Sequence, residues 1–200
     1  MPPRSLECLL DDVAFALREG LGPNDLIPML ERLLELAPRG SEASRFGQLQ
    51  LAELMVPIQP FRAASLARVV AVDCTSDHAW GIVGLALTVM GHYRAAVKAF
   101  RLAIRLAPKH AGHLHNLGHV LDVGLGQPSI AVRYLELAHG NEPNIREIAS
   151  SLAHAVALSG HRARALDILQ QRVGMNQALA CSTVDLWLSP ISTALGSAEP

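Results

Sequence analysis

Four histidines crowd one short segment of the sequence and are the residues most able to do chemistry: His110, His113, His115 and His119. His115 and His119 are four residues apart, so a helix would place both imidazoles on one face, a spacing that can hold a metal ion. Asp122 follows closely, and His154 is a further candidate ligand downstream. A site of His115, His119, Asp122 and His154 would suit a metal-binding protein or a metal-dependent enzyme. Because the sequence has no HExxH motif and no cysteine ligand nearby, polar surface residues are the simpler interpretation.

No other combination of residues indicates catalysis. The sequence contains no G-x-S-x-G nucleophile motif and no glycine-rich phosphate loop between a strand and a helix. Cys8, Cys74 and Cys181 are odd in number, far apart and outside any metal-ligand spacing, which predicts small buried side chains in a reducing compartment. We therefore expect a protein that is not an enzyme and that holds no cofactor.

The composition of the chain argues against nucleic-acid binding, membrane insertion and secretion. The formal net charge is −1 and no run of Lys or Arg stands out, so no nucleic-acid partner is expected. The longest apolar run, Trp80 to Met90, is shorter than the roughly 18 to 20 residues that cross a bilayer, so no membrane insertion is expected. The first residues carry acids where a secretory signal would be apolar. These observations predict a cytoplasmic protein, and the use of Arg in place of Lys suggests a bacterial source.

The stretch 77–110 shows two helical periods separated by a glycine. Its landmarks in chain order are Trp80, Val83, Gly84, Leu87, Gly91, Ala96, Phe100, Ala103 and Pro108. Their order and spacing match the pattern W-x2-L-G-x2-Y…A-x3-F…P, so the stretch resembles a tetratricopeptide repeat. The resemblance implies an all-α fold, an α-solenoid in which helix-turn-helix pairs stack on one another.

Less regular copies surround this stretch. They predict about five repeats in a single domain of residues 1–200, at 6–40, 41–76, 77–110, 111–145 and 146–173. In 111–145 the second helical period lies one residue later than in 77–110, and we place the extra residue in the turn GLGQPS. In 146–173, Arg172 stands where a small residue is expected.

The first two repeats diverge most from the pattern. Asn24 is the expected N-cap of the second helix in 6–40. In 41–76, Pro57 and Pro60 separate two helices, whose apolar stripes are predicted to be Phe46, Leu49, Leu51 and Leu54, then Phe61, Leu66, Val69 and Val70. Arg62 takes the small-residue position of this repeat, and Cys74 replaces its terminal proline.

A solenoid needs a cap over its last repeat, and residues 174–194 supply apolar candidates for one or two short capping helices. These candidates are Leu179, Val184, Leu186, Trp187, Leu188 and Ile191. Residues 195–200 are interpreted as a tail.

In tetratricopeptide arrays the first helix of each pair lines the concave face, so the resemblance implies which residues face a partner. They include His78, Leu85, His115, Asn116, His119, Asp122, Glu147, Ser150 and His154. Some family members clamp a C-terminal carboxylate with Lys, Asn and Arg side chains, of which only Asn116 is present here, so that function is not expected. A groove that holds Asp122 and Glu147 would instead suit an apolar peptide with a basic residue or two.

The function favoured by these features is a noncatalytic scaffold or adaptor that binds a protein or peptide partner in its groove. By analogy with other small bacterial arrays, a chaperone or assembly factor for a secretion or envelope machine is the finer hypothesis. A homo-oligomer is compatible with the sequence. The alternative is the metal-binding protein or metal-dependent enzyme built on His115, His119, Asp122 and His154.

Overall fold

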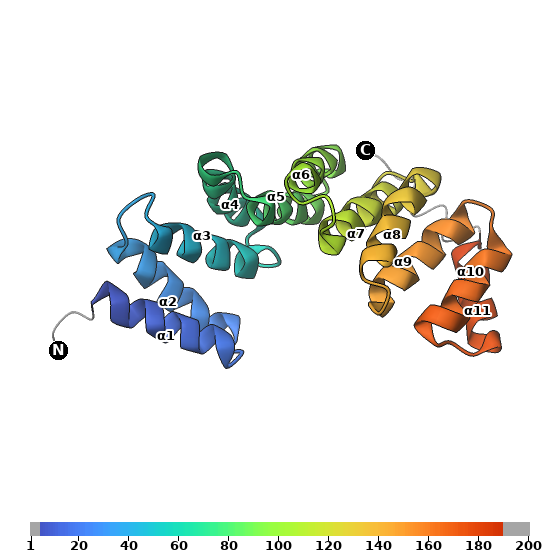
Figure 1. The fold of residues 1–200 in the computed structure, drawn as a ribbon, viewed down its shortest axis with the longest axis horizontal. Helices are drawn as coiled ribbons and strands as arrows, with labels where there is room; N and C mark the ends of the chain where they lie inside the picture. Colours follow the sequence, from blue (N-terminus) through green and yellow to red (C-terminus); the bar gives the residue numbers. More distant parts are fainter. Residues whose placement is uncertain (1–4, 190–200) are drawn as a thin grey trace. The chain divides into compact units, whose positions relative to one another are not determined.

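The computed structural model describes residues 5–189, and this part of the chain consists of helices and connecting turns without a β-strand (Figure 1). The helices are α1 (Leu6–Arg18), α2 (Pro23–Leu36), α3 (Glu42–Met55), α4 (Pro60–Cys74), α5 (Asp77–Val89), α6 (Tyr93–Leu106), α7 (Ala111–His119), η1 (Val120–Gly124), α8 (Pro128–Asn141), α9 (Arg146–Leu158), α10 (Arg162–Ile168), η2 (Leu169–Val173) and α11 (Gln177–Trp187). The predicted all-α fold with paired helices and a C-terminal helix is confirmed. No helix among the described residues combines the length and the apolar character that crossing a membrane requires.

Two compact units make up the chain, residues 1–90 and 91–200. The first contains α1 to α5, and the second contains α6 to α11. The boundary lies in the turn after α5, where Gly91 has a φ of 75°, a conformation that glycine adopts readily because it has no Cβ. The stretch 77–110, which has the most regular repeat pattern, therefore contributes one helix to each unit.

Serine caps and prolines fix where the helices of the first unit begin. Ser76 caps α5 by accepting a hydrogen bond from the backbone N–H of Ala79 at 3.2 Å. At α2 the N-cap is Gly22 and the helix begins at Pro23, so the prediction of Asn24 as the cap is wrong. Proline begins a helix well because its fixed φ is helical and the N–H that it lacks would be unpaired in the first turn.

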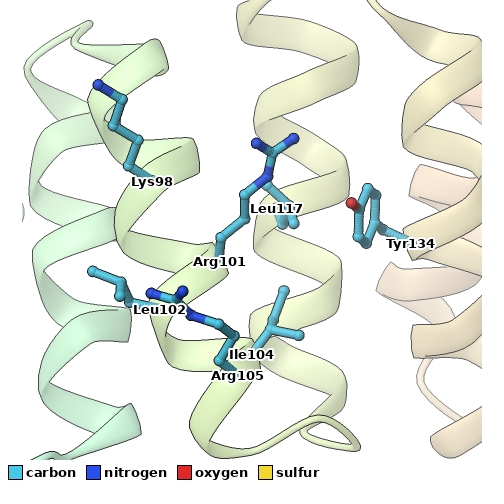
Figure 2. Close-up of a pocket in the computed structure, with 7 residues that line it drawn as sticks. All are labelled: Lys98, Arg101, Leu102, Ile104, Arg105, Leu117 and Tyr134. Carbon is cyan, nitrogen blue, oxygen red and sulfur yellow. The ribbon is translucent and has the colours of Figure 1, made fainter.

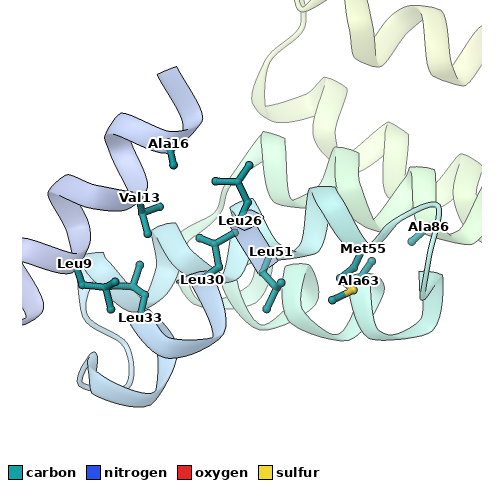
Figure 3. Packing of buried hydrophobic residues seen from close by; sticks show 10 residues of the cluster. All are labelled: Leu9, Val13, Ala16, Leu26, Leu30, Leu33, Leu51, Met55, Ala63 and Ala86. Atoms are coloured by element: carbon teal, nitrogen blue, oxygen red, sulfur yellow. The ribbon is translucent and has the colours of Figure 1, made fainter. Parts of the chain in front are cut away.

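The core of the first unit is centred on α1, α2 and α3 (Figure 3). The apolar face of α2 lies in this core, because Leu26, Leu30 and Leu33 are buried and Leu34 packs against them. Burying each such leucine contributes about 1.5–3 kcal/mol to stability. The cluster is completed by Leu9, Val13, Ala16, Leu51, Met55, Ala63 and Ala86.

The register of α4 differs from the prediction by one residue. Phe61, which was expected in the apolar stripe, is 77% exposed, whereas Ala63 and Ala67 are fully buried. Arg62 does not occupy the helix crossing, and its guanidinium forms an ion pair with Glu31 at 2.7 Å. Alanines fill the crossing because helices that approach closely have no room for a larger side chain.

The end of α4 also corrects the prediction for the cysteines. The helix ends at Cys74, and Thr75 adopts a left-handed conformation with a φ of 52°, which terminates it.

Cys74 and Cys8 are exposed and Cys181 is partly exposed, so the predicted burial of the cysteines is wrong. Leucine, valine and alanine side chains occupy the buried faces of these helices instead.

In the second unit, small residues of α7 pack against leucine on α8. A Cβ added to Gly118 would lie 2.6 Å from Cγ of Leu135, which is far closer than carbon atoms can approach. Ala131, Leu135 and Ala138 are fully buried, as the repeat pattern predicts. Gly118 therefore permits the close crossing of these two helices.

Two π-helical segments, η1 and η2, extend the helices that begin as α7 and α10. A π-turn adds one residue to a helix, so η1 accounts for the extra residue of the repeat 111–145. The prediction that the turn GLGQPS absorbs this residue is wrong. In η2 the wider turn brings Val173, which is 6% exposed, into the buried position that Arg172 would have occupied.

A single helix, α11, follows the last pair and packs against α9, α10 and η2. Its buried side chains are Ala180 and Val184, whereas Leu179 and Leu186 are exposed. Ile191 and the predicted tail lie outside the described residues. Within residues 174–189, the predicted capping segment forms one helix, and fewer of its apolar side chains are buried than the sequence pattern predicted.

Candidate functional site

Seven of the nine predicted groove residues lie in the second unit, on α7, η1 and α9. They are His115, Asn116, His119, Asp122, Glu147, Ser150 and His154. The other two, His78 and Leu85, lie on α5 in the first unit and are exposed. The candidate site is therefore the surface formed by α7, η1 and α9.

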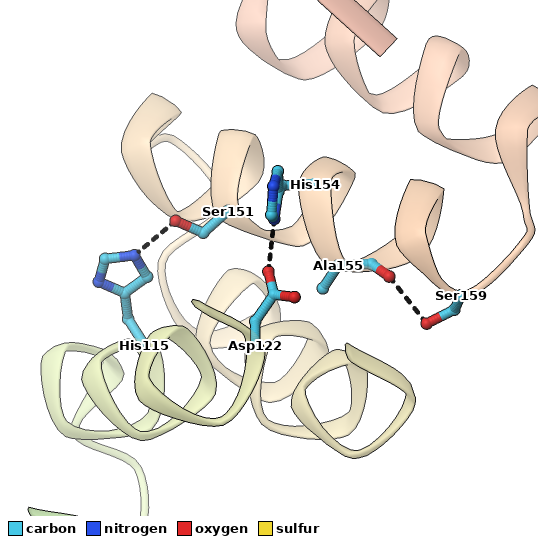
Figure 4. Close-up of polar contacts among 6 residues, drawn as sticks. All are labelled: His115, Asp122, Ser151, His154, Ala155 and Ser159. Atoms are coloured by element: carbon cyan, nitrogen blue, oxygen red, sulfur yellow. Dashed lines mark hydrogen bonds and ion pairs between the residues drawn. The ribbon is translucent and has the colours of Figure 1, made fainter. Parts of the chain in front are cut away.

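A hydrogen bond between His154 and Asp122 links η1 to α9 at this surface (Figure 4). Nδ1 of His154 lies 2.6 Å from Oδ2 of Asp122, and the Asp122 side chain is only 3% exposed. Asp122 lies within η1, the π-turn that accommodates the extra residue of this repeat. The irregular part of the helix is therefore the part that contacts His154. Such π-turns occur frequently at functional sites.

The second carboxylate oxygen of Asp122 is unusual because it is buried and has no hydrogen-bond partner. A buried carboxylate oxygen without a hydrogen-bond donor costs free energy, because it has lost its contacts with water. Oδ1 of Asp122 is thus able to accept a hydrogen bond from a buried water molecule, which would satisfy it.

Trp187 of α11 extends the site beyond the residues that were predicted. Its ring meets the imidazole of His154 edge to face, with the ring centroids 5.0 Å apart and the planes at 79°. The sequence indicated Trp187 only as a capping residue, because its approach to α9 depends on how α11 folds back. Aromatic pairs in this geometry hold both rings in defined orientations.

His115 forms the other connection between α7 and α9. Its Nε2 lies 2.9 Å from Oγ of Ser151, the neighbour of the predicted Ser150 (Figure 4). Burial lowers the pKa of His115, while the negative charge of Glu147 raises it by a smaller amount and His119 lowers it further. The imidazole is therefore neutral near pH 7, and it can either donate to the Ser151 hydroxyl or accept from it.

Around these two connections, several polar side chains reach solvent. His119 and Glu147 are exposed, and Asn116 and Ser150 are half-buried. The ring of His119 lies 6.2 Å from that of His115, so the two imidazoles predicted on one helical face are neighbours. The site thus consists of two interhelical hydrogen bonds surrounded by exposed polar groups.

In the first unit, His78 has a different environment. Its Nε2 lies 3.5 Å from Oε2 of Glu53, and this contact raises the pKa of His78 and lowers the pKa of Glu53. Both side chains are about half exposed. A surface pair of this kind contributes little to stability, so His78 keeps its side chain available to solvent.

The four residues of the proposed metal site do not assemble as a ligand set. In the described part of the chain, no three of His115, His119, Asp122 and His154 bring one ligand atom each within 4.8 Å of one another. Nε2 of His115 and Nδ1 of His154 are also engaged, with Ser151 and Asp122 respectively. This geometry does not support the metal-site alternative.

Comparison with known sequences finds distant similarity to a larger protein. No protein-family model matches the chain. Protein FlbA of Caulobacter vibrioides is 25% identical over 183 residues, which are 90% of this chain and 30% of FlbA. The chain thus spans less than a third of the length of that relative.

Solved structures share the arrangement of helices. A MamA fragment from Desulfovibrio magneticus RS-1 matches with a TM-score of 0.69 and 15% identity, covering 84% of this chain and 93% of that one. TTC0263, a thermophilic TPR protein of Thermus thermophilus, matches at 0.68 and 16%, covering 92% and 99%. YrrB, described as a TPR protein with an unusual peptide-binding site, matches at 0.60 and 20%, covering 78% and 84%. The chain has the tetratricopeptide-repeat fold.

Proposed function

We propose that this protein is a noncatalytic interaction scaffold that binds a segment of a partner protein on the surface formed by α7, η1 and α9. The observation that carries the proposal is the pair of hydrogen bonds that fix this surface, His115 to Ser151 and His154 to Asp122. A surface that is already ordered loses little conformational entropy when it binds, which favours recognition. The fold supports the same class, since YrrB, which shares it, is described as having a peptide-binding site.

The charges at this surface indicate what the partner carries. Glu147 is exposed and is not among the ion-paired residues of the described chain, so its carboxylate is available to a cationic side chain. Trp187, beside His154, presents an aromatic ring on which a cationic side chain could lie. A segment with apolar residues and one or two Lys or Arg side chains meets these features best.

The finer role within this proposal is that of an adaptor, chaperone or assembly factor for a bacterial secretion or envelope machine. It rests on analogy with other small bacterial arrays, and the similarity to FlbA covers too little of that protein to define the role. We place the protein in the cytoplasm and treat residues 1–200 as one solenoid domain within the same proposal.

The test replaces exposed side chains, because replacing buried Asp122 would also remove the hydrogen bond with His154. We expect the double variant His119→Ala with Glu147→Gln to bind Lys- and Arg-containing apolar peptides on an array at least about tenfold more weakly, a loss of about 1.4 kcal/mol. The side chains of His119 and Glu147 reach solvent at the proposed surface, so their loss removes contacts and one negative charge without opening the core.

The matched control is His161→Ala with Glu142→Gln, which removes the same side-chain types from exposed positions elsewhere in the second unit. It should bind as the unchanged protein does. Equal binding by both double variants, with circular dichroism showing intact helices, would reject the proposed surface.

A further inference from the structure

A second surface of the second unit combines an apolar hollow with positive charge (Figure 2). The hollow has a volume of about 510 Å³ and is formed by α6, α7 and α8. Its lining residues are Lys98, Arg101, Leu102, Ile104, Arg105, Leu117 and Tyr134, which we call the basic groove. Figure 2 shows Arg101 of α6 and Tyr134 of α8 reaching toward α7 from opposite sides.

The positive charge of the basic groove comes from a regular stripe on α6. Arg94, Lys98, Arg101 and Arg105 follow one another at intervals of four, three and four residues, which places them on one face of the helix. All four are exposed, and none forms an ion pair with another described residue. Neighbouring like charges repel along a helix, so an anion bound over the stripe would relieve this repulsion.

No acidic residue lies on α6 or α7, and none lines the basic groove. The sequence has no Asp or Glu anywhere between Asp77 and Asp122, and no carboxylate lines the basic groove. On α8, Glu136 is already paired with Arg164 at 2.6 Å. The net charge of −1 for the whole chain therefore conceals a local excess of positive charge on α6.

The basic groove is distinct from the surface proposed above to bind a cationic segment. Leu117 of α7 lines the groove, whereas His115 and His119 lie two residues before and after it. At 3.6 residues per turn, a shift of two residues moves a side chain to nearly the opposite side of a helix. The two surfaces therefore use opposite faces of α7 and have opposite charge preferences.

We propose that the basic groove binds an acidic segment of a partner protein that inserts an apolar side chain between α6 and α8. The partly exposed Leu102 and Ile104, with fully buried Leu117 beneath them, would contact the apolar side chain, while Arg101 and Arg105 would hold carboxylates through paired N–H groups. A nucleic-acid duplex fits less well, because a single short row of cations over a hollow neutralises few phosphates. The protein would then join a basic segment and an acidic one on two faces of one unit, a role beyond the scaffold proposed above.

The test uses the full chain and a fluorescein-labelled peptide in which leucine and phenylalanine residues are interspersed among glutamates, measured by fluorescence anisotropy. We expect the double variant Arg101→Gln with Arg105→Gln to bind this peptide at least about tenfold more weakly and with a smaller dependence on salt. The matched control, Lys109→Gln with Arg172→Gln, removes the same charge from exposed positions outside the groove and should change the affinity by less than about twofold. Leu102→Ala should also weaken binding, and circular dichroism will show whether each variant retains its helices.

Other outcomes would overturn the proposal. Equal losses in the two double variants would mean that only the overall charge matters. Equally tight binding of a polyglutamate peptide, of single-stranded DNA or of phosphatidylserine vesicles would show a general polyanion site that does not require an apolar side chain. The protein could also fail to bind the peptide and instead associate with itself. If salt and the Arg101 and Arg105 changes each abolish this self-association, the groove binds a second copy of this chain.

Discussion

At the scale of single residues, the histidines of this protein differ because their surroundings differ. His115 is partly buried, and removal from water disfavours its charged form, so its pKa is lowered. His78 is half exposed and close to Glu53, and the hydrogen bond to that carboxylate raises its pKa. The pKa values of two histidines predicted to line the same groove are therefore shifted in opposite directions.

These shifts make a prediction about stability and pH. Because the folded state holds a proton on His115 less tightly than the unfolded chain does, the free energy of unfolding should fall as the pH drops through and below 6.5, the ordinary pKa of the group. For His78 the raised pKa has the opposite effect: its contribution is present below 6.5 and is lost as the pH rises through the higher folded pKa. We expect ¹H NMR titration to place the His115 midpoint below, and the His78 midpoint above, that of an unstructured histidine.

Urea unfolding of single variants checks the same signs. On acidification, the free energy of unfolding should fall less for His115→Gln than for the unchanged protein. His78→Gln should be less stable than the unchanged protein at low pH, and the two should become equally stable as the pH rises. Finding the His115 midpoint above that of an unstructured histidine would contradict the burial that the structure assigns to it.

At the scale of the helices, small residues and π-turns set the packing of the second unit. Gly118 allows α7 and α8 to cross closely, and η1 lets α7 continue by one extra residue to place Asp122 opposite His154. A further close contact involves Gly124 in η1, where a Cβ would lie 2.7 Å from the ring of Tyr93. The helix geometry that departs from the repeat pattern thus occurs beside the candidate site.

Gly118 and Gly140 provide a matched pair of glycines within helices. We expect Gly118→Ala to destabilise the protein by about 1–3 kcal/mol, because the new Cβ would overlap the fully buried Leu135. A Cβ at Gly140 meets no atom within 4 Å, so Gly140→Ala should stabilise the protein by about 0.4–1 kcal/mol through the higher helix propensity of alanine. Thermal and urea unfolding measure both changes, and a neutral Gly118→Ala would mean that the crossing of α7 and α8 is looser than described.

At the scale of the whole molecule, two compact units divide the chain at a short turn. The three residues Met90 to His92 separate α5 from α6. The units differ in charge: residues 1–90 contain 11 acidic and 7 basic side chains, and residues 91–200 contain 7 acidic and 10 basic. The resulting net charges of −4 and +3 add to the total of −1, so the positive charge of the chain is concentrated in the second unit.

One tryptophan in each unit allows the units to be followed separately. In a repeat array, stability depends on each repeat and on its neighbours, and the connection from Met90 to His92 is short. We therefore expect Trp80→Phe and Trp187→Phe, each leaving one reporter, to show the same urea midpoint by fluorescence. Clearly separated midpoints would contradict the proposal of a single domain and assign independent stability to the two units.

The sequence by itself determined the class of fold, the helices and most of the buried side chains. These follow from local rules: apolar residues at helical spacing, small residues at crossings, and glycine or proline at the breaks. Such features are read within one repeat, and Trp80, Gly84, Ala96, Phe100 and Pro108 made the pattern recognisable. Where the pattern was weak, the predicted register was wrong by one residue. Placing either Arg62 or Ala63 at the small-residue position leaves a helix with apolar residues at helical spacing, so the sequence did not distinguish the two.

Only the tertiary structure decided how the candidate site is built. It placed the extra residue of the repeat 111–145 in a π-turn, paired Asp122 with His154, joined His115 to Ser151 and brought Trp187 of α11 against the site. The two hydrogen bonds join residues 32 and 36 positions apart along the chain, so they depend on how neighbouring repeats pack. Spacing identifies residues that share a helical face, but hydrogen bonds between helices and the exposure of each side chain arise only when the helices come together.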